Sequence, residues 1–221
     1  GAGVGAAGTE VAQALLAMLH VSDQEPSVQH FIQGCMACIA AAIKGTLDKQ
    51  ASAYSTGIGL EWVLASVLAL VRGEGAEEGS NEGTRGQESG HTMRTRERAV
   101  NVLVMVARSL PPGSAALRAF VKASSPTCLE MSLGGRSSKA KDNTAVRQGA
   151  LQVLFIGIHG LSSHAEALVP DALAVAERAL QDEDGGVREA ALKLVGACAA
   201  SCEEAFVRDE KLLGALGRVV C

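Results

Sequence analysis

Residues 167–202 read ALVPDALAVAERALQDEDGGVREAALKLVGACAASC, and this stretch decides the fold class. Pro170 suits the first turn of a helix, where its missing N–H costs nothing. Apolar residues recur after it at helical spacing. The run 181–186, Gln-Asp-Glu-Asp-Gly-Gly, interrupts that pattern, and Gly185 and Gly186 allow the chain to reverse. A second helix follows from Val187. The stretch therefore predicts two antiparallel helices joined by an acidic turn.

The second helix of this pair has an apolar stripe that a single partner helix cannot cover. On a helical wheel of about 100° per residue, six small or apolar residues share one face. They are Val187, Ala191, Leu194, Val195, Cys198 and Cys202. Because one hairpin leaves part of this stripe exposed, we expect the hairpin to stack on another hairpin.

Similar segments occur upstream, as such stacking requires. The pattern of 187–195 returns at 146–154 and at 95–103, and a weaker copy starts at Val28-Gln29. The spacing between copies grows toward the N-terminus, and the excess lies in two loops without an apolar period. Insertions in helical repeat arrays behave in this way.

The repeated unit, Leu-x-Pro followed by an acidic turn and Val-Arg-x-x-Ala-Leu, resembles the HEAT repeat of the HEAT/armadillo superfamily. The last copy matches best, through 168–170, Asp184 and 187–188. The resemblance covers most of the chain. It implies an all-α fold, a right-handed α-solenoid of about four HEAT-like helical hairpins plus a trailing helix. It also implies a structural ladder in which the arginines Arg96, Arg147 and Arg188 pair with turn aspartates such as Asp184.

The array is expected to span 9–221, after a flexible Gly/Ala tail over 1–8. Expected helices are 9–20, 27–44, 57–72, 94–110, 114–124, 144–160, 170–180, 187–202 and 203–220, with a separate segment at 127–133 after Pro126. A disordered acidic loop is expected at 73–92 and a short basic loop at 134–143. Helix 144–160 is apolar nearly all round, so we expect neighbours on several sides of it. The chain ends within an apolar helix that has no polar cap, so we expect a fragment of a longer array.

Composition narrows the function classes. The chain has 221 residues, 48% of them hydrophobic and only 3% aromatic, and its net charge is −4. Nucleic-acid binding needs a basic face, so no nucleic-acid partner is expected. No run of about 18 apolar residues is apparent, so no membrane span is expected. Most of the six cysteines fall within apolar helical patterns. Buried, reduced thiols suit a cytoplasmic protein, with a nuclear location also open.

Patterns that carry chemistry are weak. Cys35-x-x-Cys38 lies mid-helix without further ligands at zinc spacing, so both thiols are interpreted as core residues. His159 and His164 flank two serines, but no nucleophile motif accompanies them. The glycines of 1–8 match a dinucleotide fingerprint without the strand that it requires. We therefore expect no enzyme activity, no metal and no cofactor.

The expected binding surface lies on the second helices, which line the concave side in the family that the chain resembles. The residues opposite the apolar stripe form a ridge of mixed polarity, which we call the second-helix ridge. Its members are Glu97, Asn101, Arg108, Gln148, Gln152, His159, Glu189 and Lys193. Such a surface is able to hold an extended segment or a helix of a protein partner.

The sequence thus predicts a non-catalytic protein–protein interaction scaffold. Two alternatives stay open. One is a TOG-like tubulin-binding array that uses the intra-repeat turns, although the turn at 181–186 lacks basic residues. The other is a karyopherin-like transport receptor or an adaptor for the assembly of complexes such as axonemal dyneins. The identity of the partner is not encoded in a recognisable motif.

Overall fold

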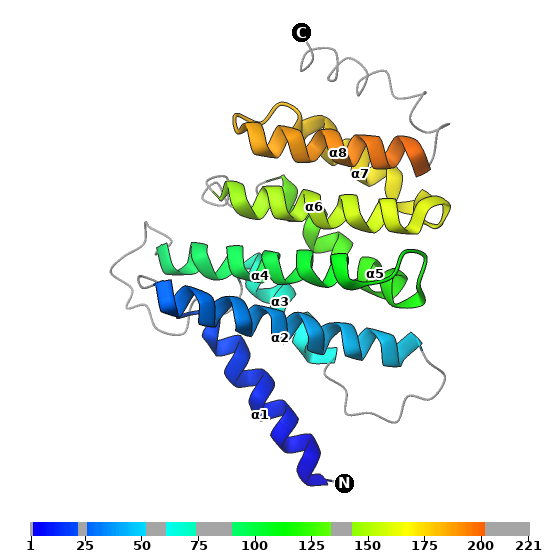
Figure 1. The fold of residues 1–221 in the computed structure, drawn as a ribbon. Coiled ribbons are helices and arrows are strands. Elements are labelled where there is room, and N and C mark those ends of the chain that lie inside the picture. Colours follow the sequence, from blue (N-terminus) through cyan, green and yellow to red (C-terminus); the bar gives the residue numbers. More distant parts are fainter. Residues whose placement is uncertain (1, 22–25, 52–60, 74–89, 134–142, 202–221) are drawn as a thin grey trace. The chain divides into compact units, whose positions relative to one another are not determined.

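A computed structural model describes residues 2–21, 26–51, 61–73, 90–133 and 143–201. All regular structure in these ranges is helical (Figure 1). The elements are α1 (Ala2–Met18), α2 (Pro26–Ala51), α3 (Glu61–Arg72), α4 (Gly90–Ser109), α5 (Ala115–Ser132), α6 (Thr144–Leu161), the 3₁₀ helix η2 (Ser162–Leu168), α7 (Val169–Ala179) and α8 (Gly185–Ser201). The prediction of an all-α fold is confirmed for this part of the chain.

The chain divides into two compact units, Gly1–Ser109 and Leu110–Cys221. In the first unit, α2 packs against α1, α3 and α4, and α3 packs against α4. The core between these helices is aliphatic, with Leu19, Ile39, Val67 and Leu103 at most 1% exposed. The unit therefore consists of two helical hairpins whose second helices, α2 and α4, lie against each other.

The second unit repeats this plan with α5–α6 and α7–α8. Helix α6 packs extensively against both α5 and α8, while α7 covers α8 and also touches α5. Within this unit, α6 and α8 thus form one layer and α5 and α7 the other (Figure 1). The core contains Phe120, Leu151, Leu154, Ile158 and Leu194, all at most 2% exposed. The expectation that the apolar helix around 144–160 has neighbours on several sides is confirmed.

Two glycines bring α5 and α6 close together. A Cβ atom built on Gly157 would lie 2.7 Å from a γ-methyl of Val121, and one built on Gly160 would lie 2.7 Å from a δ-methyl of Leu117. Carbon atoms in ordinary contact are about 3.5–4.0 Å apart. Glycine at these two positions is therefore what permits the observed packing distance.

Helix α1 begins at Ala2, so residues 2–8, which we expected to form a flexible tail, belong to a helix. Extending an existing helix costs far less than starting one, so the helix predicted from residue 9 continues toward the N-terminus. Helix α2 also runs past its expected end, because Leu47 continues its buried stripe and Lys44 pairs with Asp48 one turn on.

Helix α5 is continuous from Ala115 to Ser132, although Pro126 was expected to divide it. The proline ring is exposed, on the side where water can satisfy the carbonyl that loses its partner. Ser124 and Ser132 donate hydroxyl hydrogen bonds to the carbonyls of Phe120 and Cys128 within the helix.

Helix α8 begins at Gly185 rather than Val187, so both glycines lie in its first turn and not in the reversal. A Cβ on Gly186 would lie 3.1 Å from a carboxylate oxygen of Asp184 and 3.3 Å from the Gln148 amide nitrogen of α6. Gly186 is thus a point of close approach between α8 and α6. The trailing helix at 203–220 and nearly all of both predicted loops lie outside the described residues.

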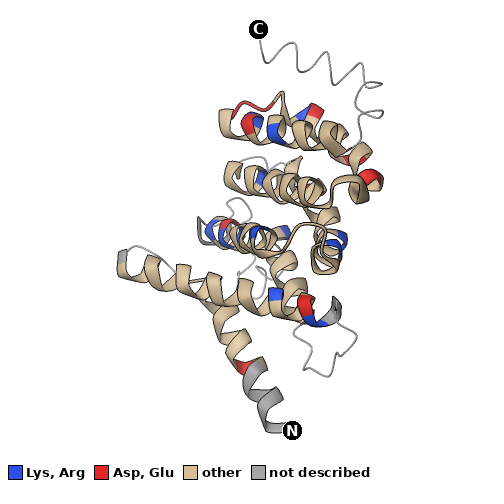
Figure 2. Cartoon of the chain, turned by 45° about the vertical axis from the view of Figure 1, so that its right-hand side comes forward, with Lys and Arg blue, Asp and Glu red and all other residues tan. Residues whose placement is uncertain are grey.

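One helix meets the length and composition of a membrane span, although no such run was apparent in the sequence. The segment Ser27–Lys49 of α2 is long and apolar enough to cross a bilayer. A mostly buried core helix passes the same test, and in this segment 39% of the most apolar window is buried, with Ile32, Ile39 and Ile43 among the buried residues. Figure 2 shows how few charged residues α2 carries.

Candidate functional site

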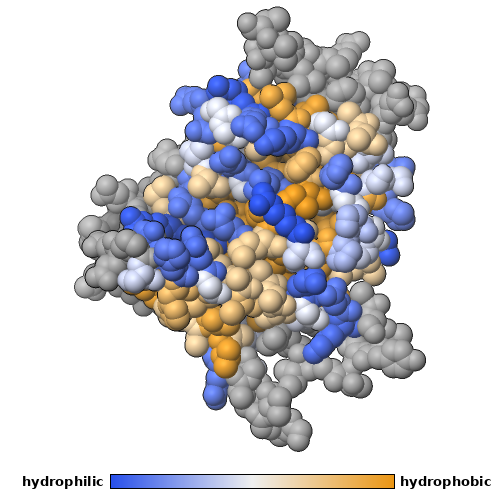
Figure 3. Space-filling model, in the orientation of Figure 1, coloured by the Kyte–Doolittle hydropathy of each residue, from blue (hydrophilic) through white to orange (hydrophobic). Residues whose placement is uncertain are grey.

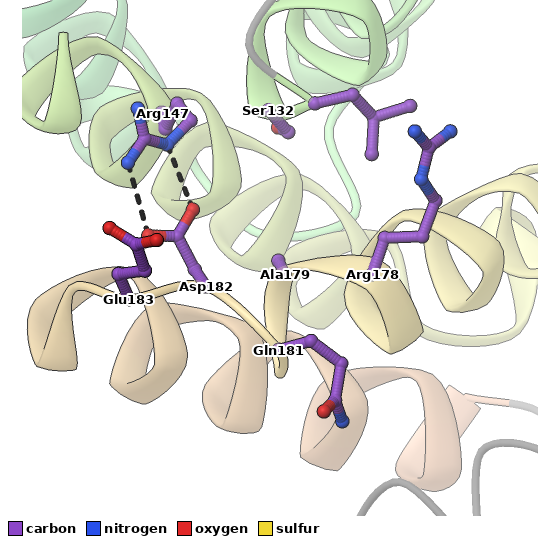
Figure 4. A pocket seen from close by; sticks show the side chains of 8 residues that line it. Ser132, Arg147, Arg178, Ala179, Gln181, Asp182 and Glu183 are labelled. Atoms are coloured by element: carbon purple, nitrogen blue, oxygen red, sulfur yellow. Dashed lines mark hydrogen bonds and ion pairs between the residues drawn. The ribbon is translucent and has the colours of Figure 1, made fainter. Parts of the chain in front are cut away.

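An ion pair joins the two hairpins of the second unit. Arg147, in the first turn of α6, donates from Nε and Nη2 to the two carboxylate oxygens of Asp182, each at 3.0 Å (Figure 4). The side chains are only 11% and 17% exposed. A planar guanidinium held by two parallel hydrogen bonds fixes orientation as well as distance. The pair therefore sets the position of the α7–α8 turn relative to α6.

The acidic partner of Arg147 is Asp182 and not the predicted Asp184. Asp184 instead caps α8, because its Oδ1 accepts a hydrogen bond of 3.0 Å from the backbone N–H of Val187. Asp182 also accepts a hydrogen bond from the backbone N–H of Asp184. The ladder aspartate was misassigned because the helix was expected to begin two residues late.

The other two ladder arginines contact main-chain carbonyls of their own hairpins. Arg188 donates from Nη1 to the carbonyls of Asp182 and Glu183, both at 2.8 Å. Arg96 donates from Nε to the carbonyl of Val71 at the end of α3, at 3.1 Å. Last-turn carbonyls of a helix and turn carbonyls lack helical partners, so these bonds satisfy groups that would otherwise need water. The three arginines are therefore structural, but only Arg147 forms the expected arginine–aspartate pair in the described residues.

A further arginine, which the sequence pattern did not single out, ties the hairpins of the first unit together. Arg98 of α4 donates from Nη1 to the carbonyls of Leu19 and Val21, at 2.8 and 2.6 Å. Thr95 donates its hydroxyl to the same Leu19 carbonyl at 3.3 Å. Arg98 lies two residues after Arg96, at a position where the repeated pattern has no arginine. That additional arginine was the feature of the sequence that could have indicated this role.

A depression of about 360 Å³ lies beside the Arg147–Asp182 pair (Figure 4). The end of α5 forms one wall with Ser132 and Leu133, and the α7–α8 turn forms the other. Arg178 and Glu183 add one positive and one negative charge, so the lining as a whole is balanced. Since its two acidic groups offset its two arginines, the depression offers no strong preference for a charged ligand.

The second-helix ridge is accessible wherever it was predicted. In α6, Gln148 and His159 are exposed and Gln152 is half-buried, and in α8 Glu189 and Lys193 are exposed. In the first unit, α4 exposes Asn101 and Arg108 and half-exposes Glu97. Lys193 donates to Glu189 at 2.7 Å, and this hydrogen bond lowers the pKa of the Glu189 carboxyl. In Figure 3, hydrophilic and hydrophobic side chains alternate over the α6–α8 surface.

An aromatic residue of α6 lies one turn from His159 of the ridge. Phe155 is half-buried, and its ring stacks on the imidazole of His159 with centroids 5.8 Å apart and planes inclined by 16°. Spacing of four residues on one helix brings the two rings together. The pair gives this polar surface a local apolar element.

The expectation that Cys35 and Cys38 are both core residues is confirmed only for Cys35. Cys35, Cys128 and Cys198 are buried, whereas Cys38 is exposed. Burial raises the pKa of the Cys128 thiol to about 12, and burial, followed by the nearby Cys38, raises that of Cys35. Among the described residues, no group of three or more His, Cys, Asp or Glu side chains is arranged to hold a metal ion.

Comparison with known proteins gave no relative. The chain matches no family model, and it matches neither a curated protein nor a solved structure. The HEAT-like assignment therefore depends on the residues of the chain itself.

Proposed function

We propose that the chain is a non-catalytic protein–protein interaction scaffold, a HEAT-like solenoid that binds its partner along the exposed face of its second helices. The observation that carries this proposal is the arrangement of α6 and α8. They pack side by side in one layer, and the side chains at corresponding positions of both helices are exposed. Such a layer is a continuous surface to which each repeat contributes a few contacts.

The inter-hairpin ion pair supports the same proposal. Because Arg147 and Asp182 fix the α7–α8 turn to α6, the spacing between the two exposed faces is set before a partner arrives. A surface that needs no ordering on binding retains more of its interaction energy as affinity. A rigid arrangement therefore favours binding by a surface whose small and polar residues each contribute little.

Site-specific photocrosslinking in a cell lysate tests the proposal. Benzoylphenylalanine is placed at Gln152 on α6 or at Lys193 on α8. Control positions are the exposed Ala174 of α7, in the first-helix layer, and the exposed Gln181 of the α7–α8 turn. The proposal expects the same partner protein to crosslink from Gln152 and Lys193 and not from Ala174.

Two outcomes contradict it. Crosslinks from Ala174 alone would place the binding surface on the first helices. Crosslinks from the exposed Gln181 alone would place it on the α7–α8 turn, as a tubulin-binding array of the TOG type requires.

A further inference from the structure

A groove of about 280 Å³ lies between α2 and α4 in the first unit. From α2, Ile32, which is 2% exposed, and Met36, which is half-buried, line the groove. Gln33 of α2 and Asn101 of α4 are exposed and line its two sides. The groove thus has an apolar floor and carboxamide groups on both walls.

The lining residues follow each helix for two turns. On α2 they run from Gln29 to Met36, and on α4 from Arg94 to Asn101, at spacings of three and four residues. Seven helical residues rise by about 10 Å. An extended chain advances about 3.3 Å per residue, so the groove accommodates about three residues of such a chain.

Carboxamide walls favour an extended main chain over a helix. A carboxamide group both donates and accepts hydrogen bonds, as the peptide groups of an extended segment do. A helical partner has already used its main-chain groups internally, and helices dock instead in grooves with apolar walls. The polar walls and the apolar floor therefore match main-chain recognition combined with one buried aliphatic side chain.

The charges along the groove do not favour a polyanion. Arg98 is buried and donates to the carbonyls of Leu19 and Val21, so its position is fixed by the fold. Glu97 places a carboxylate one turn from Arg94 on the same helix. A nucleic-acid backbone requires several cations facing it without intervening acids.

We propose that this groove binds an extended segment of a partner protein through the main chain of about three residues, with an aliphatic side chain over Ile32 and Met36. The inference relies on the proposed function for the nature of the partner, a protein, and adds the conformation in which it is bound. Gln33 and Asn101 are the residues that recognise the main chain.

A random-peptide phage library selected on the whole chain provides the probe. Binding of the selected peptides is then measured by titration against the wild type and against the double variant Gln33→Ala/Asn101→Ala. Gln13→Ala on α1 is the matched carboxamide deletion, and Gln152→Ala on α6 reports binding to the second-helix ridge. All four side chains lie at least partly in solvent, so the variants are expected to fold, which circular dichroism verifies. Peptides methylated on one main-chain nitrogen at a time test the main-chain contacts directly.

The double variant is expected to lose at least about tenfold in affinity, since it lacks two hydrogen-bonding groups. Methylation at one or two adjacent nitrogens should cause a similar loss, and Gln13→Ala should cause none. Selected peptides that bind as amphipathic helices, or that bind the double variant as tightly as the wild type, overturn the inference. Peptides that lose affinity only with Gln152→Ala overturn the groove assignment while leaving the scaffold function in place. The absence of second-helix crosslinks in the lysate experiment would instead count against the function itself.

Discussion

Replacing Gly157 by alanine should destabilise the second unit, although alanine is the better helix former. The added Cβ would lie 2.7 Å from a γ-methyl of Val121, about 1 Å inside normal contact. Val121 is 8% exposed and β-branched, so its side chain has little freedom to rotate away. Helix α5 or α6 must move, and overpacking of this kind costs about 1–3 kcal/mol.

The gain in helix propensity offsets part of that cost. Alanine is favoured over glycine in a helix interior by about 1 kcal/mol. Gly196 of α8 isolates this gain, because nothing lies within 4 Å of a Cβ built there. Gly196→Ala should therefore stabilise the chain by about 0.5–1 kcal/mol. The two variants make the same chemical change, so the difference in their unfolding free energies, about 1–3 kcal/mol, measures the contact with Val121.

Urea unfolding followed by circular dichroism supplies both free energies, with the slope m compared across variants because two units need not unfold together. The added substitution Val121→Ala should relieve the clash, so Gly157→Ala should cost less in that background than in the wild type. Equal stability of Gly157→Ala and Gly196→Ala would refute the packing distance between α5 and α6 described above.

Three further predictions concern single features. Ser162 is the one described non-glycine residue with positive φ (φ 51°, ψ −129°), so Ser162→Gly should raise the melting temperature by a few degrees through about 1 kcal/mol of relieved strain. Arg147→Met and Asp182→Leu should each destabilise the fold by about 1–3 kcal/mol, and the double variant should lose less than the sum of the two, as measured in a double-mutant cycle. Cys38 should react with iodoacetamide in the native protein at about pH 8, whereas Cys128, whose burial raises its pKa to about 12, should react only after unfolding, as peptide mass spectrometry would show.

Helix periodicity predicted the all-helical fold and most of its helices, because the apolar stripes of the second helices extend over several turns. The same stripes predicted which residues are solvent-exposed, so every member of the second-helix ridge lies at least partly in solvent. Pattern alone did not predict that helix α5 continues through Pro126. That outcome depends on the proline facing solvent, which is a property of the packed unit.

The sequence did not predict which acid of the α7–α8 turn pairs with Arg147. The turn offers three adjacent acids, Asp182, Glu183 and Asp184, and a motif selects among them only by counting from the helix start. The first residues of α8 are glycines, which have low helix propensity, so the start was placed two residues late and the capping aspartate was taken for the ladder aspartate. The α2–α4 groove was also missed, because it depends on residues from two helices far apart in the sequence.

Because Asp182 and Asp184 have different partners, the α7–α8 turn should tolerate insertions and deletions poorly. One carboxylate reaches outward to the preceding hairpin and the other reaches inward to start α8, with a single residue between them. A residue inserted at that point would rotate one of them away from its target, whereas the same insertion elsewhere on the surface would be absorbed by a loop. Natural or engineered variants of this protein should accordingly differ in length at their longer connections. The five-residue segment 180–184 should keep its length.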